Sequence, residues 1–406
     1  MVRLRLAGVL FMYWLVMSAS AADWPQWRGP ERNGISPETG LLDTWPKGGP
    51  PQIWKTQGLG YGYAGLAISQ GRLFTQGQRG DHQFVLALDA ATGKKLWETA
   101  TSPAFPQDRG DGPRGTPTVD GDRLFAMAGE GTLVSLDARS GGMIWKMNVA
   151  EKFGGRAPNW GYSESPLVDG SNLIVTPGGP GAAIVALDKK TGNLMWKSQS
   201  DPAAYSSPIA AEVGEIRQII VFTSEGVVGL RSNNGALLWR YNRVANRTAN
   251  IATPIFQNGF VFVSSAYGTG CALLKLTAEG GTVKATEVYF SREMQNHYST
   301  SVVVGDSAYG FSNAILTAMN LETGRVAWRD RSVGKGSVTY ADGKLYLLSE
   351  DGVVGLTEAT SVGYRERSRF EISRGAFPTW TPPVISGGRL YLREQDNLYC
   401  FDIRRR

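Results

Sequence analysis

One ten-residue pattern recurs along the chain and constrains the fold more than any other feature. It consists of Leu-Asp, three residues, Gly, three further residues and Trp. Three clear copies end at Trp97, Trp145 and Trp196, and two degenerate copies end at Trp239 and Trp328. Neighbouring tryptophans are 43 to 51 residues apart, apart from one gap of 89 residues that equals two steps. Because repeats of about 40–50 residues are typical of propellers and solenoids, we expect a series of similar β units.

The pattern has a structural explanation within each unit. The Asp can accept hydrogen bonds from backbone N–H groups ahead of it, and the Gly supplies a positive φ, so a tight turn between two strands is predicted. The Trp then lies on a strand, where its large ring can pack against the neighbouring unit. We therefore expect inter-blade docking, and not catalysis, from Trp54, Trp97, Trp145, Trp196, Trp239 and Trp328.

Counting the innermost strands gives eight repeats of four strands. Repeats five and seven lack the Trp, and Tyr289 and Phe370 are candidates to replace it. The last repeat lacks its outer strand, whereas residues 52–55 form a strand with no inner strands before it. The sequence thus predicts an all-β, eight-bladed β-propeller of four-stranded blades, closed by an N-terminal outer strand on the C-terminal blade, beside residues 397–402. Seven blades is the alternative count.

The N-terminus has the features of a secretory signal peptide. Arg3 and Arg5 precede an apolar run over residues 7–17, and small residues follow. That run is too short for a membrane anchor, and no cysteine follows it to carry a lipid, so we expect a periplasmic or secreted bacterial protein. The expected organisation is a signal peptide, an N-terminal extension and a single propeller domain, over residues 1–22, 23–49 and 50–406.

Composition agrees with a fold of short strands and tight turns. The 406 residues include 51 Gly and 20 Pro. The formal net charge of +6 is mild for this length, so nucleic acid is not expected as a partner. Cys271 and Cys400 both lie in apolar strand-like runs, which favours buried free thiols over a disulfide. We expect a monomer with no membrane-spanning segment after signal cleavage.

The tandem Leu-Asp-x-x-Thr-Gly-x-x-x-Trp repeats resemble those of the pyrroloquinoline-quinone (PQQ) type propeller family. That family includes quinoprotein alcohol dehydrogenases and the outer-membrane assembly lipoprotein of the Bam complex. The resemblance covers about residues 50–403, and the opening segment 23–30 is similar to exported members. It is specific for the fold but says little about function, because the repeated residues belong to the blade and not to a site.

A candidate ligand site follows from the segments that lead into the innermost strands. Propellers commonly bind ligands there, around the central channel, and in this chain these segments and the loops before them are rich in aromatic and cationic residues. Such a site would suit an anionic planar ligand, a carboxylate-rich sugar or an acidic peptide. The alternative is that the arginines are solvated and the tyrosines only pack the channel. The candidate residues are Tyr63, Arg114, Arg156, Trp160, Tyr162, Glu164, Tyr205, Asn250, His297, Tyr298, Lys335 and Trp380.

Two functions remain open. The family resemblance implies a possible quinone site with a calcium ion, for which Glu164 and Asn250 are candidate ligands. No matching catalytic Asp can be assigned, however, and the adjacent cysteines of those dehydrogenases are absent. No His/Cys cluster has the spacing of a metal site. We therefore expect a non-catalytic exported binding or scaffold protein of the cell envelope, without a cofactor, whose partner is an envelope protein or a glycan. The alternative is a PQQ-dependent alcohol or sugar dehydrogenase.

Overall fold

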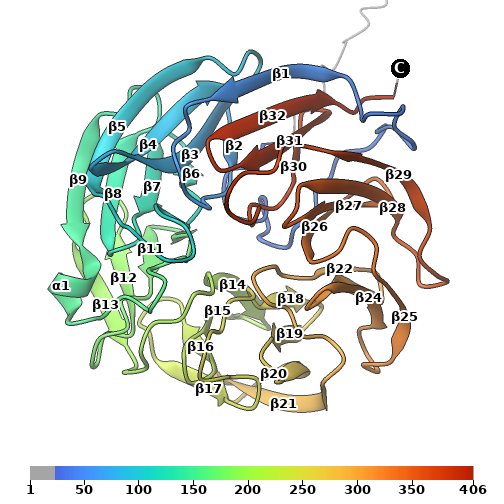
Figure 1. Cartoon of the computed structure of the whole chain (residues 1–406). Coiled ribbons are helices and arrows are strands. Elements are labelled where there is room, and N and C mark those ends of the chain that lie inside the picture. Colours follow the sequence, from blue (N-terminus) through green and yellow to red (C-terminus); the bar gives the residue numbers. More distant parts are fainter. Residues whose placement is uncertain (1–22, 406) are drawn as a thin grey trace, which may run out of the picture.

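The computed structural model describes residues 23–405 and shows eight four-stranded antiparallel sheets arranged in a ring (Figure 1). The predicted eight-bladed propeller is confirmed, and the count of seven blades is wrong. The predicted signal peptide over residues 1–22 lies outside the described residues. The described chain contains one short helix, α1 (Val149–Phe153), and none of its helices is long and apolar enough to cross a membrane.

Blades 1 to 4 follow the chain in order, each from its innermost strand outward. Blade 1 contains β2 (Ala67–Ser69), β3 (Arg72–Arg79), β4 (His82–Asp89) and β5 (Lys95–Pro103). Blade 2 contains β6 (Thr118–Asp120), β7 (Arg123–Met127), β8 (Thr132–Asp137) and β9 (Met143–Asn148). Blade 3 contains β10 (Leu167–Asp169), β11 (Asn172–Val175), β12 (Ile184–Asp188) and β13 (Leu194–Ser198). Blade 4 contains β14 (Ile209–Val213), β15 (Ile216–Phe222), β16 (Val227–Arg231) and β17 (Leu237–Tyr241).

Blades 5 to 8 complete the ring. Blade 5 contains β18 (Ile255–Gln257), β19 (Phe260–Ser265), β20 (Gly270–Glu279) and β21 (Thr282–Ser291). Blade 6 contains β22 (Val302–Val304), β23 (Ser307–Ser312), β24 (Ile315–Asn320) and β25 (Val326–Asp330). Blade 7 contains β26 (Gly336–Ala341), β27 (Lys344–Ser349), β28 (Val353–Glu358) and β29 (Glu366–Glu371). Blade 8 contains β30 (Val384–Ser386), β31 (Arg389–Glu394) and β32 (Asn397–Asp402), with β1 (Gln52–Gln57) as its outer strand.

The ring closes where β1 pairs antiparallel with β32. Trp54 lies opposite Cys400 and Thr56 opposite Leu398, as the orphan N-terminal strand predicted. In Figure 1 the blue β1 runs beside the red β32. A buried arginine adds a second closure, because Arg393 of β31 donates hydrogen bonds to backbone oxygens of Ala64 (2.9 Å) and other acceptors of blade 1. Strand pairing and a charged clasp thus join the two ends of the chain.

Five of the six docking tryptophans link their blade to the next by a hydrogen bond as well as by packing. The indole N–H of Trp97 donates to the carbonyl of Ala138 (3.3 Å), one residue after the Asp of the next repeat. Trp54, Trp145 and Trp196 make the corresponding bond, and Trp328 bonds the carbonyl of Thr360 in the next blade, whereas Trp239 bonds Gln218 of its own blade. Trp54, Trp196 and Trp239 are buried, and the other three docking tryptophans are half-buried.

The Gly of the repeat has two roles. Gly141 has a φ of +76°, which lets it close the turn started by Asp137. A Cβ at this position would lie 2.6 Å from the ring of Trp97 in the preceding blade. The same approach recurs at Gly93 with Trp54. The neighbouring tryptophan therefore packs against the backbone of the glycine, in the space that a side chain would fill.

The two repeats without a tryptophan solve the docking differently. In blade 5, Tyr289 takes the place of the ring, since Gly324 of the next repeat lies against it. In blade 7, Phe370 is joined by Trp45 of the N-terminal segment, which packs edge-on to it at 5.3 Å and against Tyr346 at 6.0 Å. The extension therefore supplies the indole ring that the seventh repeat lacks.

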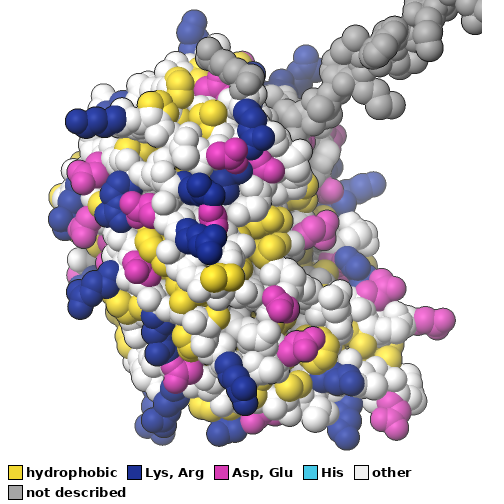
Figure 2. Space-filling model, turned by 90° about the vertical axis from the view of Figure 1, so that its right-hand side faces the viewer, with side chains coloured by type: hydrophobic (Ala, Val, Ile, Leu, Met, Phe, Trp, Pro, Cys, Tyr) yellow, Lys and Arg dark blue, Asp and Glu magenta, His cyan; other side chains and the backbone are white. Residues whose placement is uncertain are grey.

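Charged side chains on the rim are mixed in sign. On the face shown in Figure 2, basic and acidic groups are interspersed with small apolar areas. Surface pairs such as Arg369 with Glu366 (2.6 Å) account for part of this mixture. The outside of the ring thus contrasts with the interior cavity described below.

Adjacent glycines of the second repeat provide a matched test of this docking. We expect Gly141→Ala to lower the free energy of unfolding by about 1–3 kcal/mol, because it strains the turn and pushes Trp97 away. Gly142→Ala should change it by less than about 0.5 kcal/mol, since its Cβ would meet only Ser140 Oγ, at 3.4 Å. Urea denaturation measures both, and equal effects would contradict the docking role.

Candidate ligand-binding site

A cavity with a volume of about 530 Å³ lies where the chain leads into the innermost strands. Its walls come from loops of all eight blades, so a ligand there would contact residues far apart in sequence. Eight of the twelve residues predicted from the sequence line it. They are Tyr63, Arg114, Trp160, Tyr205, His297, Tyr298, Lys335 and Trp380.

Aromatic rings cover much of the wall. Tyr63 and Trp380 have ring centroids 4.6 Å apart, and Tyr298 stacks on Trp380 at 5.6 Å. Trp160 and Tyr205 form a second pair at 5.7 Å. Flat apolar surfaces of this kind bind planar groups and the apolar faces of sugars, and they exclude water from polar contacts.

Cations are set among these rings. The Arg114 guanidinium lies 4.9 Å from the ring centroid of Tyr63 and donates from Nε to the carbonyl of Trp160 at 2.7 Å. Burial lowers the pKa of Arg114, but an arginine so placed stays charged at neutral pH. Arg109 and Lys335 also line the cavity, against one lining carboxylate, Glu350. The lining therefore carries an excess of positive charge.

The lining carboxylate is paired with a cation, and the lining imidazole is uncharged. Glu350 forms an ion pair with Lys335 (3.0 Å) and accepts a hydrogen bond from the indole of Trp380 (2.7 Å). His297 lies with Nε2 2.9 Å from the hydroxyl of Tyr267. Burial, with a smaller effect of Lys335, lowers the pKa of His297 to about 4, so the imidazole is uncharged at pH 7. These groups can orient a ligand through hydrogen bonds and charge.

Nine of the seventeen lining residues are not among the twelve candidates, and three of these nine show why sequence reasoning missed them. Trp27 comes from the N-terminal segment, whose position no repeat predicts. Tyr267 and Glu350 lie on the turns between the second and third strands of blades 5 and 7. Strand direction alternates in an antiparallel blade, so this turn lies at the same end of the blade as the start of the first strand. The strand order alone could therefore have indicated that these turns reach the cavity.

Four predicted residues do not line the cavity. Arg156 is exposed on the loop after α1. The ring of Tyr162 is buried between blades 2 and 3, and its hydroxyl donates to the carbonyl of Pro177 at 2.7 Å. Glu164 and Asn250 are buried as well and bind other protein groups.

Glu164 is a buried carboxylate held by the next strand. It accepts hydrogen bonds from the backbone N–H of Thr176 (2.6 Å) and from the hydroxyl of the same residue. Burial raises the pKa of Glu164 to about 7, although Thr176 and the charge of Arg32 act in the opposite direction. Its oxygens therefore face blade 3 and the channel interior instead of the cavity.

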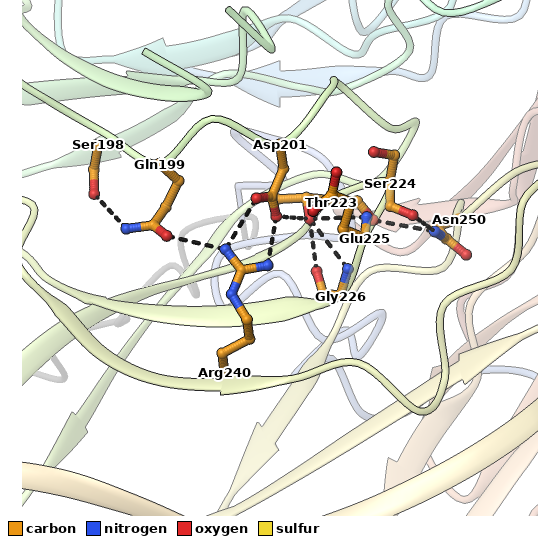
Figure 3. Close-up of polar contacts among 9 residues, drawn as sticks. All are labelled: Ser198, Gln199, Asp201, Thr223, Ser224, Glu225, Gly226, Arg240 and Asn250. Atoms are coloured by element: carbon orange, nitrogen blue, oxygen red, sulfur yellow. Dashed lines mark hydrogen bonds and ion pairs between the residues drawn. The ribbon is translucent and has the colours of Figure 1, made fainter. Parts of the chain in front are cut away.

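Asn250 belongs to a polar network that joins blades 3, 4 and 5 (Figure 3). Its amide donates to the carbonyls of Thr223 and Ser224, both at 3.1 Å. The hydroxyl of Thr223 in turn donates to Asp201 (2.5 Å), which also pairs with both terminal nitrogens of Arg240. The role of Asn250 in this structure is to hold adjacent blades together.

The chain was compared with known proteins. A family model described as "Outer membrane protein assembly factor BamB" matches residues 81–330, more than half of the chain. The chain belongs to this family of PQQ-type propellers. Curated relatives include BamB of Shewanella oneidensis, 26% identical over 58% of this chain, and BamB of Yersinia pestis, 25% identical over 59%. The chain spans 61% and 62% of the length of these two relatives.

Other relatives of this BamB-like chain have enzyme names. The dehydrogenase subunit of a quinone-dependent alcohol dehydrogenase from Gluconobacter oxydans is 30% identical over 38% of this chain and 22% of its own length. Tetrathionate hydrolase of Acidithiobacillus ferrooxidans is 22% identical over 91% of the chain and 80% of its own length. Among solved structures, BamB from Moraxella catarrhalis matches with a TM-score of 0.65 at 16% identity, over 87% of this chain and all of that one. This last likeness shows the fold alone.

The residues of this BamB-like chain do not fit the quinone and calcium arrangement that the family resemblance suggested. Glu164 and Asn250 lie outside the cavity and their polar atoms are bonded to protein groups. Cys271 and Cys400 are buried free thiols in the cores of blades 5 and 8. Within residues 23–405, no three His, Cys, Asp or Glu side chains gather in a way that could hold a metal ion.

Glu164 should make stability depend on pH. Its folded pKa of about 7 exceeds its ordinary value of 4.5, so the folded state binds more protons between these values. Stability from this group is complete below about pH 4.5 and is lost as the pH rises through about 7, by at most about 1.4 kcal/mol per pH unit. We expect Glu164→Gln, which mimics the protonated acid, to lack this loss. His297 acts with the opposite sign in both proteins and cancels from the difference between their urea denaturation curves. The same pH profile in both proteins would contradict the assignment.

Proposed function

We propose that this chain is an exported, non-catalytic binding or scaffold protein of the cell envelope, which holds an acidic segment of a partner protein in its cavity. The observation that carries the proposal is the charge and shape of the cavity: three cationic side chains against one carboxylate, set among aromatic rings in about 530 Å³. Cations partly shielded from water by aromatic walls attract carboxylates more strongly than exposed ones do.

A protein partner is favoured by the family. Its model is described as an assembly factor, a class of activity that depends on binding other proteins. The signal peptide expected over residues 1–22 supports export to the periplasm or out of the cell, where a protein of the cell envelope can be reached. Aromatic rings also bind sugars. Binding of an acidic glycan would therefore replace the protein partner by a glycan.

The side chains of the cavity are better suited to binding than to proton transfer. His297 is a weak base, because burial lowers its pKa to about 4, and Glu350 is held in an ion pair with Lys335 (3.0 Å). Burial raises the pKa of Tyr63 to about 12, so this hydroxyl stays protonated at neutral pH. A general base requires a carboxylate or imidazole free to take a proton near pH 7, and these lining groups do not provide one.

Two arginines provide a matched test of binding. The mature chain is titrated calorimetrically with a short peptide of alternating Glu and Tyr, and with the same peptide in which Lys replaces Glu. We expect saturable binding of the acidic peptide alone, weakened about tenfold by Arg114→Gln and weakened by added salt. Arg156→Gln, which removes an exposed arginine outside the cavity, should leave the affinity unchanged.

The competing functions are outcomes of the same experiment. Binding of both peptides, or equal loss in the two arginine variants, would contradict a specific acidic site in the cavity. Saturable binding of a uronic acid oligosaccharide but not of the peptide would replace the protein partner by a glycan. Reduction of an artificial electron acceptor by alcohols or sugars, with PQQ and calcium added, would establish the dehydrogenase alternative.

A further inference from the structure

Residues 24–34 cross the middle of the ring instead of running along its outside. At one end, Trp24 pairs with Ile68 of the innermost strand of blade 1, and the carbonyl of Pro25 accepts from Val119 of blade 2 (2.8 Å). At the other end, the backbone N–H of Tyr340 in blade 7 donates to the carbonyl of Gly34 (2.9 Å), and the N–H of Ser36 donates to the carbonyl of Tyr340 (2.8 Å). Backbone pairing to three blades therefore fixes both ends of this segment.

Two buried arginines hold the segment between these ends. Arg28 donates to the carbonyls of Thr300 (3.1 Å) and Ser301 (2.6 Å), where blade 6 begins. Arg32 reaches the other side of the ring and donates to the carbonyl of Ser165 in blade 3 (3.1 Å). It also binds the carbonyls of Pro166 and Pro208, the latter in blade 4. Their side chains are 5% and 3% exposed, so the segment spans the ring as a charged cross-brace.

The backbone of the segment adopts a strained conformation that its surroundings must maintain. Arg28 and Arg32 have φ values of 62° and 53°, in the left-handed region that disfavours side chains. Gly29 packs against the ring of Trp24, and Gly34 packs against the guanidinium of Arg28. Such conformations persist only where many contacts determine them, and here the hydrogen bonds of the two arginines do so.

The segment seals the ring on one side and forms a floor on the other. The space between it and blades 1, 2, 7 and 8 has a volume of about 10 Å³, no more than a single water needs. On the opposite side Trp27 lines the large cavity, with its indole N–H donating to Thr253 Oγ1 at 2.9 Å. The cavity is therefore closed at its inner end by the N-terminal segment.

We infer that residues 24–34 are the end wall of the cavity, that Trp27 is a ligand-contacting residue, and that Arg28 and Arg32 position it. The contact with ligand rests on the proposed binding function, whereas the wall does not. Without this segment the loops of the eight blades would surround an open channel, and a bound group would have no apolar surface beneath it. The repeats build the walls, and the segment before them sets the depth of the site.

Cysteine labelling tests the wall without any ligand. Trp27→Cys places a thiol at the floor, and the chain's own Cys271 and Cys400 are buried and should not react in the folded protein. We expect the thiol to react with a negatively charged methanethiosulfonate reagent at least about threefold faster than with a positively charged one, because the lining is cationic. Arg114→Gln in the same background should reduce this ratio.

Trp24→Cys is the matched control in the same segment. Trp24 is 3% exposed in the core between blades 1 and 8, so a thiol there should stay unreactive while the protein is folded. Circular dichroism melting shows whether each variant is folded. The inference is overturned if the thiol at position 27 is as unreactive as that at 24, or if it reacts equally with both reagents and Arg114→Gln has no effect.

The positioning role and the ligand contact have separate readouts. Adding Arg32→Met to Trp27→Cys should free the segment from the ring. The thiol at position 27 should then react with the negatively and the positively charged reagent at similar rates. Unchanged rates in a folded double variant would overturn the role of Arg32. Protection of the thiol at position 27 by the acidic peptide supports contact with the ligand. Failure of protection, with the anion preference intact, would leave the wall in place and contradict the proposed binding function.

Discussion

Closure of the ring is the constraint on which the rest of this structure depends. Blades 1 to 7 could stack in an open arc, but an arc exposes the apolar faces of its first and last blades and leaves one outer strand unpaired. Pairing of β1 with β32 removes that strand edge, and Arg393 ties blade 8 to the backbone of blade 1. A guanidinium buried without these acceptors would be costly, so the clasp favours the closed ring over any open arrangement.

The site follows from this closure. Its residues come from every blade, and they converge only when the last blade meets the first: Tyr63 of blade 1 and Trp380 of blade 8 form the closest ring pair in the wall. Most blades are in turn fixed to the next by a ring of the repeat, as where Trp97 packs on Gly141 and bonds the carbonyl of Ala138. The docking residues therefore fix the blades relative to one another, while the residues that line the cavity lie on the loops.

The features that recur in each repeat could be predicted from the sequence. Features of segments that do not repeat were missed. Blade number, the closing strand and eight cavity residues follow from strand order, because the starts of all innermost strands converge. Side-chain direction does not follow: Ser163 lines the cavity, while its neighbours Tyr162 and Glu164 point into the protein, as alternation in an extended segment requires. Trp27 and Trp45 were missed because the N-terminal segment has no internal repeat to place it, although both complete what the repeats leave open.

In this structure the N-terminal part of the chain closes both the ring and the cavity. Hydrogen exchange followed by mass spectrometry tests this most directly, on peptides covering residues 24–34 and 52–57 of the mature protein. The account predicts that the hydrogen-bonded amides of both segments are protected as strongly as those of the innermost strands, because they open only when the ring opens. Exchange of either segment at the rate of the exposed loops, while the blades stay protected, would contradict it.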